Sequence, residues 1–201
     1  MSRPINEKRP EELRNAIVRY LIKHGLTGLS LRPLAKALGC TPRVLLYHFG
    51  SKEKMVIEVL AQVRRSQRAA YGRIEEASFT KGYLTVWKRM SAPDSEPLFR
   101  LFFEIYGIAL RRPRLYKAFL QDTVQDWLQV MTDEFAGERQ QRKQARAIAT
   151  IVLAGLRGFM LDFCTTHDRK RVDEAVELWL RSLDSMLTTL KGGFGTHVKR
   201  N

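Results

Sequence analysis

Hydrophobic residues recur every three to four positions along almost the whole chain. This spacing places them on one side of an α-helix, whereas a half-buried strand would alternate polar and apolar residues. No segment shows convincing alternation, so we predict an all-α fold of about nine helices. The predicted helices are Pro10–His24, Leu31–Leu38, Pro42–Phe49, Lys52–Glu76, Thr80–Ser91, Glu96–Arg111, Pro113–Phe135, Glu138–His167 and Arg171–Lys191.

Two of these helices, Leu31–Leu38 and Pro42–Phe49, are short and are separated by a tight turn at Gly39–Cys40. Ser30 and Thr41 stand at their starts and are good N-cap residues. Two short helices with such a turn are typical of a helix-turn-helix, whose second helix enters the major groove of DNA. An ordinary helical hairpin has the same spacing, so both interpretations stay open on the spacing alone.

The second of these helices is expected to have a buried side and an exposed side. The small predicted core consists of Leu34, Leu38, Leu45 and Phe49 above Leu13 and Ile17 of the first helix. The exposed side would carry Arg43, Tyr47 and His48. An Arg side chain can bond two acceptors of guanine, and Tyr and His can reach phosphates or base edges.

The charge of the chain is strongly positive and unevenly distributed. The formal net charge is +14, from 35 basic and 21 acidic residues. Residues 1–70 hold 14 of the basic and 5 of the acidic side chains, a net charge of +9. Basic proteins pair with polyanions, of which a phosphate backbone is the commonest. A solvated surface would give the same count, but the excess coincides with the predicted helix-turn-helix.

The run SLRPLAKALGCTPRVLLYHFGSKEKMVIEVL, residues 30–60, resembles the DNA-binding signature of the TetR family of transcription regulators. The matching features are Ala35, the turn at Gly39, Tyr47-His48-Phe49 and Ser51-Lys52-Glu53, with an upstream helix that ends at Gly25 and is followed by Leu29-Ser30-Leu31. The resemblance is specific over about residues 10–60 and beyond that concerns helix number and length. It implies a homodimeric, all-helical regulator with a DNA-reading head and a domain that senses a small molecule.

The resemblance also implies roles for single residues. The implied DNA-binding residues are Arg32, Thr41, Pro42, Arg43, Val44, Tyr47, His48 and Lys52. Lys52 would grip a phosphate, helped by the positive N-terminal end of its helix. The family usually has tyrosine three residues before the Phe, where this chain has Leu46. Tyr47 is the residue that could make the phosphate contact instead.

An aromatic cluster in the second half of the chain can be interpreted as a binding pocket. The segment Leu98–Leu110 is apolar on more than one helix face, so it is expected to be buried on several sides. The candidate ligand-binding residues are Phe99, Phe102, Phe103, Tyr106, Trp127, Met131 and Phe159. They could line an apolar pocket or form a solid aromatic core, and the residues alone favour neither. The resemblance favours the pocket.

The last two predicted helices carry surplus apolar surface. Residues 148–163 are apolar nearly all round, and Gly155 and Gly158 would allow close approach. The last helix repeats apolar residues at heptad-like spacing. The candidate dimer-interface residues are Gly155, Val172, Val176, Trp179, Leu183, Met186 and Leu190. They predict a four-helix bundle across a two-fold axis, and internal packing is the alternative.

Two charged residues within the apolar segments need partners. Asp162 could face a cationic ligand, or pair with Arg157 or with an Arg of a partner chain, and we favour a structural pair. Glu104 lies four residues after Arg100, which is the spacing of a surface ion pair.

Other classes of protein fit the sequence less well. The histidines at 24, 48, 167 and 197 stand at no recognisable catalytic spacing, and no Gly-rich phosphate loop occurs. Cys40 and Cys164 lie far apart, without metal-ligand spacing. We therefore expect neither an enzyme nor a bound metal or cofactor. No signal peptide or membrane span is recognised, so we expect a cytoplasmic protein without a membrane partner.

These observations predict a DNA-binding domain at 1–55, a ligand-binding and dimerisation domain at 56–191, and a disordered tail at 192–201. The helix 52–76 is the continuous segment between the first two. The expected function is a ligand-responsive regulator, a repressor that a small apolar or amphipathic effector releases from a palindromic operator. An activator, or an architectural DNA-binding protein that needs no ligand, is the alternative.

Overall fold

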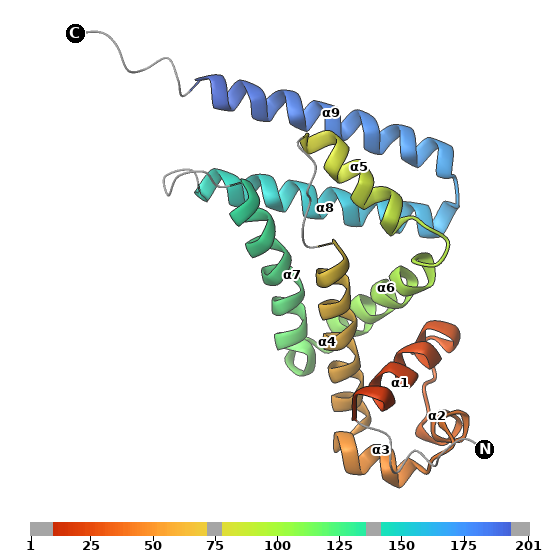
Figure 1. Cartoon of the computed structure of the whole chain (residues 1–201). Helices are drawn as coiled ribbons and strands as arrows, with labels where there is room; N and C mark the ends of the chain where they lie inside the picture. Colours follow the sequence, from red (N-terminus) through yellow and green to blue (C-terminus); the bar gives the residue numbers. More distant parts are fainter. Residues whose placement is uncertain (1–9, 72–77, 136–141, 194–201) are drawn as a thin grey trace. The chain divides into compact units, whose positions relative to one another are not determined.

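The structure of the chain is a computed structural model that describes residues 10–71, 78–135 and 142–193. Within these ranges the backbone forms nine α-helices and no strand (Figure 1). The helices are α1 (Pro10–His24), α2 (Leu31–Leu38), α3 (Pro42–Phe49), α4 (Lys52–Tyr71), α5 (Phe79–Met90), α6 (Glu96–Arg111), α7 (Pro113–Phe135), α8 (Arg142–Thr166) and α9 (Arg169–Gly193). The predicted all-α fold is confirmed.

The helix ends show where local signals decide the structure. The bounds of α1, α2, α3, α6 and α7 are those expected from the sequence. α9 begins two residues earlier than expected because Asp168 caps it, with Oδ1 accepting a hydrogen bond from the backbone N–H of Arg171 at 3.2 Å. Two predicted helix ends lie outside the described residues, namely Glu76 at the end of the fourth helix and Glu138 at the start of the eighth. Most of the predicted tail lies outside them too. Gly192 and Gly193 are the last residues of α9.

The described chain divides into two compact units. The first consists of Met1–Gly72 and Pro97–Thr150, and the second of Arg73–Glu96 and Ile151–Asn201, in each case over their described residues. The first unit thus contains α1–α4, nearly all of α6, and α7. The second contains α5 and α9, and α8 is shared between the two.

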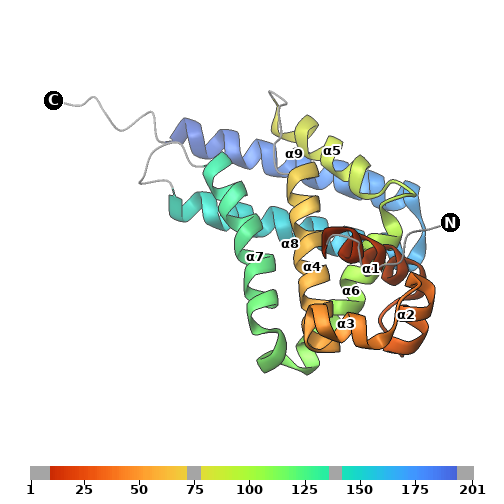
Figure 2. The same ribbon diagram turned by 60° about the horizontal axis from the view of Figure 1, so that its bottom comes forward.

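The first unit has one hydrophobic core under the helix-turn-helix. We call α1–α3 and the first turn of α4, residues 10–55, the head. In both ribbon views α3 lies beside the start of α4, with α2 next to it (Figure 2). The core includes Leu13, Ile17, Leu34, Leu45 and Phe49 of the head, and Leu101, Ile105, Ala109, Tyr116 and Phe119 of α6 and α7. The head therefore shares a continuous core with α6 and α7.

The second unit is organised around Trp87 of α5. Its side chain is 2% exposed, and its ring meets those of Phe159 and Phe163 of α8 edge-on, with centroids 6.5 and 6.4 Å away. The indole Nε1–H donates to Oδ1 of Asp173 on α9 at 2.6 Å. One side chain thus joins α5, α8 and α9 through apolar contacts and a charge-assisted hydrogen bond.

Helix α8 is long and apolar enough to cross a membrane by length and composition alone. The core helix of a soluble protein passes the same test, so this property is weak evidence for a membrane. Here Val152, Leu156 and Met160, spaced four residues apart, are buried within the second unit. This internal packing accounts for much of the apolar character of α8.

Candidate nucleic-acid interface

The turn between α2 and α3 depends on a left-handed residue. Gly39 has φ 68°, a conformation that costs a residue with a side chain more than it costs glycine. The N–H of Cys40 then donates to the carbonyl of Ala35 at 2.9 Å, which closes the end of α2. Thr41 accepts a hydrogen bond from the N–H of Val44 at 3.4 Å, so α3 begins immediately after the turn.

Helix α3 is buried on one face and open on the other. Leu45 and Phe49 are 1% and 5% exposed and belong to the core of the first unit. Arg43 and Tyr47, four residues apart, are both exposed, and the Tyr47 side chain reaches 85%. This exposed face can present a guanidinium and a phenol to a partner without disturbing the core beneath.

The start of α4 is tied to the loop between α1 and α2. The Nζ of Lys52 donates a hydrogen bond to the carbonyl oxygen of Leu29 at 2.7 Å. An ammonium group has three donors, so this bond leaves two of them for an anion. Lys52 is exposed at the N-terminal end of its helix, where the backbone N–H groups also favour negative charge.

The same loop is also held by Glu104 of α6. One carboxylate oxygen, Oε2, accepts the N–H of Leu26 at 2.9 Å. The other, Oε1, accepts the N–H and the hydroxyl of Thr27, both at 2.5 Å. The sequence suggested only a surface ion pair for Glu104. The structure adds a three-bond clamp that joins α6 to the head.

Removal of this clamp should loosen the head. We expect Glu104→Ala to lower the free energy of unfolding by about 2 kcal/mol, because hydrogen bonds to a charged group are lost. Amide hydrogen exchange at Leu26 and Thr27 should become faster, while amides of α9 keep their rates. Glu58→Ala, which removes an exposed carboxylate from α4 of the same unit, is the matched control. Unchanged protection of both loop amides in Glu104→Ala would contradict the clamp.

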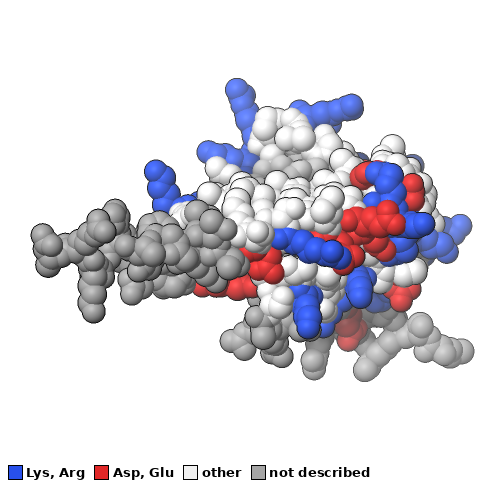
Figure 3. Space-filling model, turned by 90° about the horizontal axis from the view of Figure 1, so that it is seen from above, with Lys and Arg blue, Asp and Glu red and all other residues white. Residues whose placement is uncertain are grey.

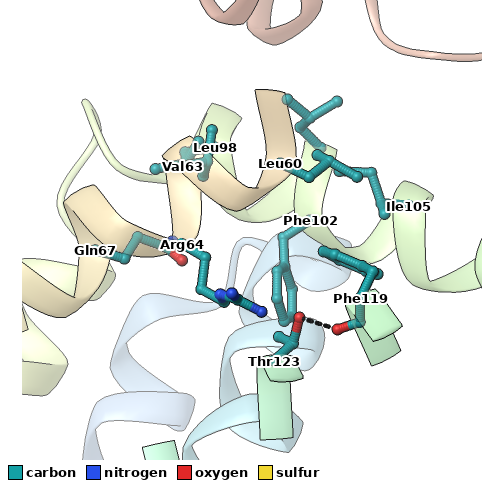
Figure 4. A pocket seen from close by; sticks show the side chains of 10 residues that line it. Leu60, Val63, Arg64, Gln67, Leu98, Phe102, Ile105, Phe119 and Thr123 are labelled. Atoms are coloured by element: carbon teal, nitrogen blue, oxygen red, sulfur yellow. Dashed lines mark hydrogen bonds between the residues drawn. The ribbon is translucent and has the colours of Figure 1, made fainter. Parts of the chain in front are cut away.

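Three helices of the first unit, α4, α6 and α7, enclose a small cavity (Figure 4). Its lining residues are Leu60, Val63, Arg64, Gln67, Leu98, Leu101, Phe102, Ile105, Phe119 and Thr123. The cavity volume is about 10 Å³, which is the space of one water molecule. The Phe102 ring and the Arg64 side chain both lie across it in Figure 4.

The polar groups at this cavity are largely engaged within the protein. The guanidinium of Arg64 forms ion pairs with Asp122 at 3.5 Å and Asp126 at 3.2 Å. The hydroxyl of Thr123 donates to the carbonyl of Phe119 at 2.6 Å. Gln67 is 8% exposed, and within the described part of the chain its Nε2 has no hydrogen-bond partner. Gln67 therefore offers a buried donor at this cavity.

The second unit exposes apolar side chains along α8 and α9. On α8, Ile151 and Leu161 are 44% and 47% exposed. On α9, Leu178 and Met186 are 69% and 38% exposed. We call these four side chains the apolar face. Its exposed leucines and isoleucine are the kind of surface that another protein surface can cover.

Sequence comparison identifies the N-terminal part of the chain. Residues 13–59 match the family described as bacterial regulatory proteins, tetR family. The head belongs to the TetR family. No curated protein is significantly similar in sequence to the chain.

Solved structures extend the likeness beyond this TetR-family head. A transcriptional regulator from Rhodococcus sp. has a TM-score of 0.72 at 17% identity, over 87% of this chain and 95% of that one. GusR from Salmonella enterica has a TM-score of 0.69 at 15% identity, over 88% and 95% of the chains. The multidrug binding protein EbrR, solved with imidazole and with proflavin, has a TM-score of 0.62 at 21% identity in the imidazole complex, over 84% and 93%. At these identities the likeness establishes the fold.

The structure brings the expected DNA-binding residues of the TetR-family head to one region, α2, α3 and the start of α4. Those exposed are Arg32, Thr41, Arg43, Tyr47, His48 and Lys52, and those half-buried are Pro42 and Val44. Leu46, which stands where the family usually has tyrosine, is 42% exposed. Tyr47 is the more exposed of the two neighbours.

The expected ligand-binding residues are only partly brought together. Phe99, Phe102, Phe103 and Tyr106 form a chain of ring contacts on α6, with centroids 4.6–6.4 Å apart. The seven residues proposed from the sequence also include Trp127 and Met131 of α7. Of these seven, Phe102 lines the cavity. Phe159 belongs to the second unit, where its ring contacts Trp87 and Trp179. Arg64, Gln67 and Thr123 were missed because polar residues on a helix normally face solvent.

The residues expected at the dimer interface divide between interior and surface. Val172, Val176 and Leu183 are buried inside the second unit, so the heptad-like seam is largely internal core. Gly155 lies against the ring of Trp179, where any side chain would overlap it. Met186 is exposed, and the side chain of Leu190 lies outside the described residues. Ile151 and Leu161 of α8, which are exposed, were not singled out from the sequence, because a helix that is apolar nearly all round does not reveal its outer face. Leu178 of α9 is also exposed and stands outside the heptad-like series.

Asp162 forms a structural pair, as we favoured, and its partner is Arg171 of α9. Its two carboxylate oxygens accept hydrogen bonds from the Arg171 guanidinium at 2.9 and 2.7 Å. These hydrogen bonds lower the pKa of the Asp162 carboxyl. Asp168 contacts the same guanidinium at 3.3 Å. In the view of Figure 3, acidic and basic side chains lie intermixed on the right of the picture, beside a broad area without Lys, Arg, Asp or Glu.

Proposed function

We propose that the protein is a dimeric DNA-binding regulator in the cytoplasm, a repressor that leaves a palindromic operator when a small apolar or amphipathic effector binds. The observation that carries the proposal is the exposed Arg43–Tyr47 face of α3 on a TetR-family head. Reading helices of this motif enter the major groove with their N-terminal residues against base edges. The net charge of +9 over residues 1–70 favours a polyanionic partner.

Substitutions in the head should separate specificity from general affinity. We expect Arg43→Ala to cost about 1–3 kcal/mol on the preferred site and to relax discrimination at one base position. Lys52→Ala should instead weaken binding to all duplexes alike and reduce the salt slope by about 1 for each bound protomer, because it removes a phosphate contact. Gel-shift titrations on a selected site and on a scrambled duplex measure both effects.

A substitution in the second unit provides the control for these measurements. Lys88→Ala removes an exposed cation of α5 and should leave both affinities close to those of the unaltered protein. The assignment of the reading face fails if Arg43→Ala and Lys52→Ala both bind as the unaltered protein does.

The dimer is supported by the apolar face of α8 and α9. A two-fold axis would bring this face against its own copy and form a bundle of four helices. Leu178 and Leu161 would be the principal apolar contacts. Small neighbours on α8, Ala154 and Gly158, are also exposed and would let the helices approach closely. Two reading helices would then meet successive major grooves about 34–36 Å apart.

The effector would bind in the cavity among α4, α6 and α7. The aromatic cluster of α6 and the buried donor of Gln67 suit an apolar molecule that carries a hydrogen-bond acceptor. A cavity of about 10 Å³ must widen to admit it, and a movement of the Phe102 ring would provide the space. EbrR, which has this fold, was solved with proflavin and with imidazole.

The switch would act through α6. Phe102 at the cavity and Glu104 at the loop of the head are two residues apart on that helix, so a shift of one is transmitted to the other. Linkage requires that an effector which weakens DNA binding is itself bound more weakly by the DNA complex. A coupling of about 1–3 kcal/mol would lower operator affinity roughly 5–150-fold.

A compound screen tests the sensing part directly. Compounds that raise the melting temperature of the free protein should also lower its affinity for the selected site. If compounds bound among α4, α6 and α7 leave that affinity unchanged, the protein is a ligand-independent DNA-binding protein.

A further inference from the structure

The connection between α6 and α7 is densely basic. Residues 105–121 contain no Asp or Glu, and within them stand Arg111, Arg112, Arg114 and Lys117. All four side chains are exposed, and none is in an ion pair with another described residue. We call residues 111–117 the basic turn. Its charges are therefore available to an anionic partner.

The basic turn lies in the same unit as the head and shares a cleft with it. Arg111 and Arg112 line a cleft of about 400 Å³ together with Lys52 at the start of α4. Leu26 and Leu29 of the loop between α1 and α2 also line this cleft. In Figures 1 and 2 the lower end of α7 lies beside the lower part of α4. Arg111 and Arg112 of the basic turn therefore line the same cleft as Lys52, the residue that is proposed to bind a phosphate.

The balance of charge around this cleft is positive. Glu53 is the one carboxylate among its lining residues, against Lys52, Arg111 and Arg112. Burial and then the Glu53 carboxylate raise the pKa of the Tyr116 hydroxyl, and the nearby Arg112 opposes that rise. Tyr116 is therefore a neutral hydroxyl at neutral pH. Guanidinium groups bind phosphate well because they present paired donors and are weakly hydrated.

We propose that the basic turn is a second DNA-contacting surface, which binds the phosphate backbone beside the groove occupied by α3. The proposal rests on the proposed function, since the head brings the duplex to this side of the first unit. The turn carries no base-reading role and adds sequence-independent affinity. Lys52 stands between the two surfaces and contributes to both.

Salt dependence of DNA binding tests the proposal. The triple variant Arg111→Gln, Arg112→Gln, Arg114→Gln loses three charges of the turn. Each phosphate contact on B-DNA contributes about 0.9 to the slope of log affinity against log salt. We expect the slope of the triple variant to be smaller by about 2–3 for each bound protomer, and its affinity to fall by more than about a hundredfold at about 0.1 M salt. Binding is measured by fluorescence anisotropy of a labelled duplex that extends past the head on both sides.

A matched control distinguishes the loss of a phosphate contact from the loss of positive charge alone. Lys81→Gln, Lys88→Gln, Arg89→Gln removes the same charge from exposed positions of α5 in the second unit. The proposal requires that this control keeps the slope of the unaltered protein. It is overturned if both triple variants change the slope equally, or if the variant of the turn leaves the slope unchanged.

Thermal stabilisation by inorganic phosphate distinguishes a DNA surface from a small-anion site. Phosphate is added at constant ionic strength to the unaltered protein and to the triple variant of the turn. If phosphate stabilises the protein only when the turn is intact, while the salt slope of DNA binding does not change, the cleft is a small-anion site and the DNA surface is rejected. If the unaltered protein binds no duplex, the proposed function itself fails.

Discussion

Leu178→Glu should convert the proposed dimer into monomers. Leu178 is the most exposed residue of the apolar face, at 69%, and a charge there would be buried without a partner against a second copy. A monomer meets one half-site, so affinity for a palindromic duplex should fall by more than about a thousandfold, roughly half of the binding free energy. Sedimentation velocity gives the mass of the variant, and a gel shift gives its affinity.

An equally exposed leucine outside the apolar face provides the control. Leu110 of α6 is 67% exposed and lies in the first unit, so Leu110→Glu should remain dimeric. The dimer model is rejected if Leu178→Glu sediments as the unaltered protein does, or if the unaltered protein is itself a stable monomer.

Trp87→Ala should produce the largest loss of stability. Truncation of a buried Trp costs about 3–5 kcal/mol, because contacts are lost and a cavity remains. Here the loss includes the hydrogen bond from Nε1 to Asp173, whose carboxylate then keeps the more distant contact with Arg169 at 3.9 Å. Urea unfolding followed by circular dichroism measures the change in midpoint.

A conservative variant divides this loss into two parts. Trp87→Phe keeps most of the apolar contact with Phe163 and removes the donor to Asp173. It should cost about 1–3 kcal/mol, the range for a charged acceptor that loses its partner. A change within about 0.5 kcal/mol for Trp87→Ala, as for a surface residue, would contradict the role of Trp87 as the centre of the second unit.

The helices and the head could be predicted because their signals are local. Gly39 ends α2 and Thr41 caps α3 within three residues of chain, and the structure has both features. Pro113 begins α7 where the sequence places it. Such turns and caps depend on neighbours in sequence, which are visible without knowledge of the fold.

The sites could be predicted less well because they depend on contacts between distant segments. Glu104 meets Thr27 across 77 residues, and its spacing to Arg100 suggested only a local pair. In the same way, the period of Val172, Val176 and Leu183 is that of any helix with one buried face. Whether such a face meets α5 of the same chain or a second copy is decided by tertiary packing.

Two copies of α3 should read one palindromic duplex. Selection of bound duplexes from a random pool, followed by sequencing, tests whether they do. We expect enriched sites with two inverted half-sites whose centres lie about 10–10.5 base pairs, or a small multiple of that spacing, apart. Enrichment of a single unrepeated site, or of no sequence at all, would contradict this expectation.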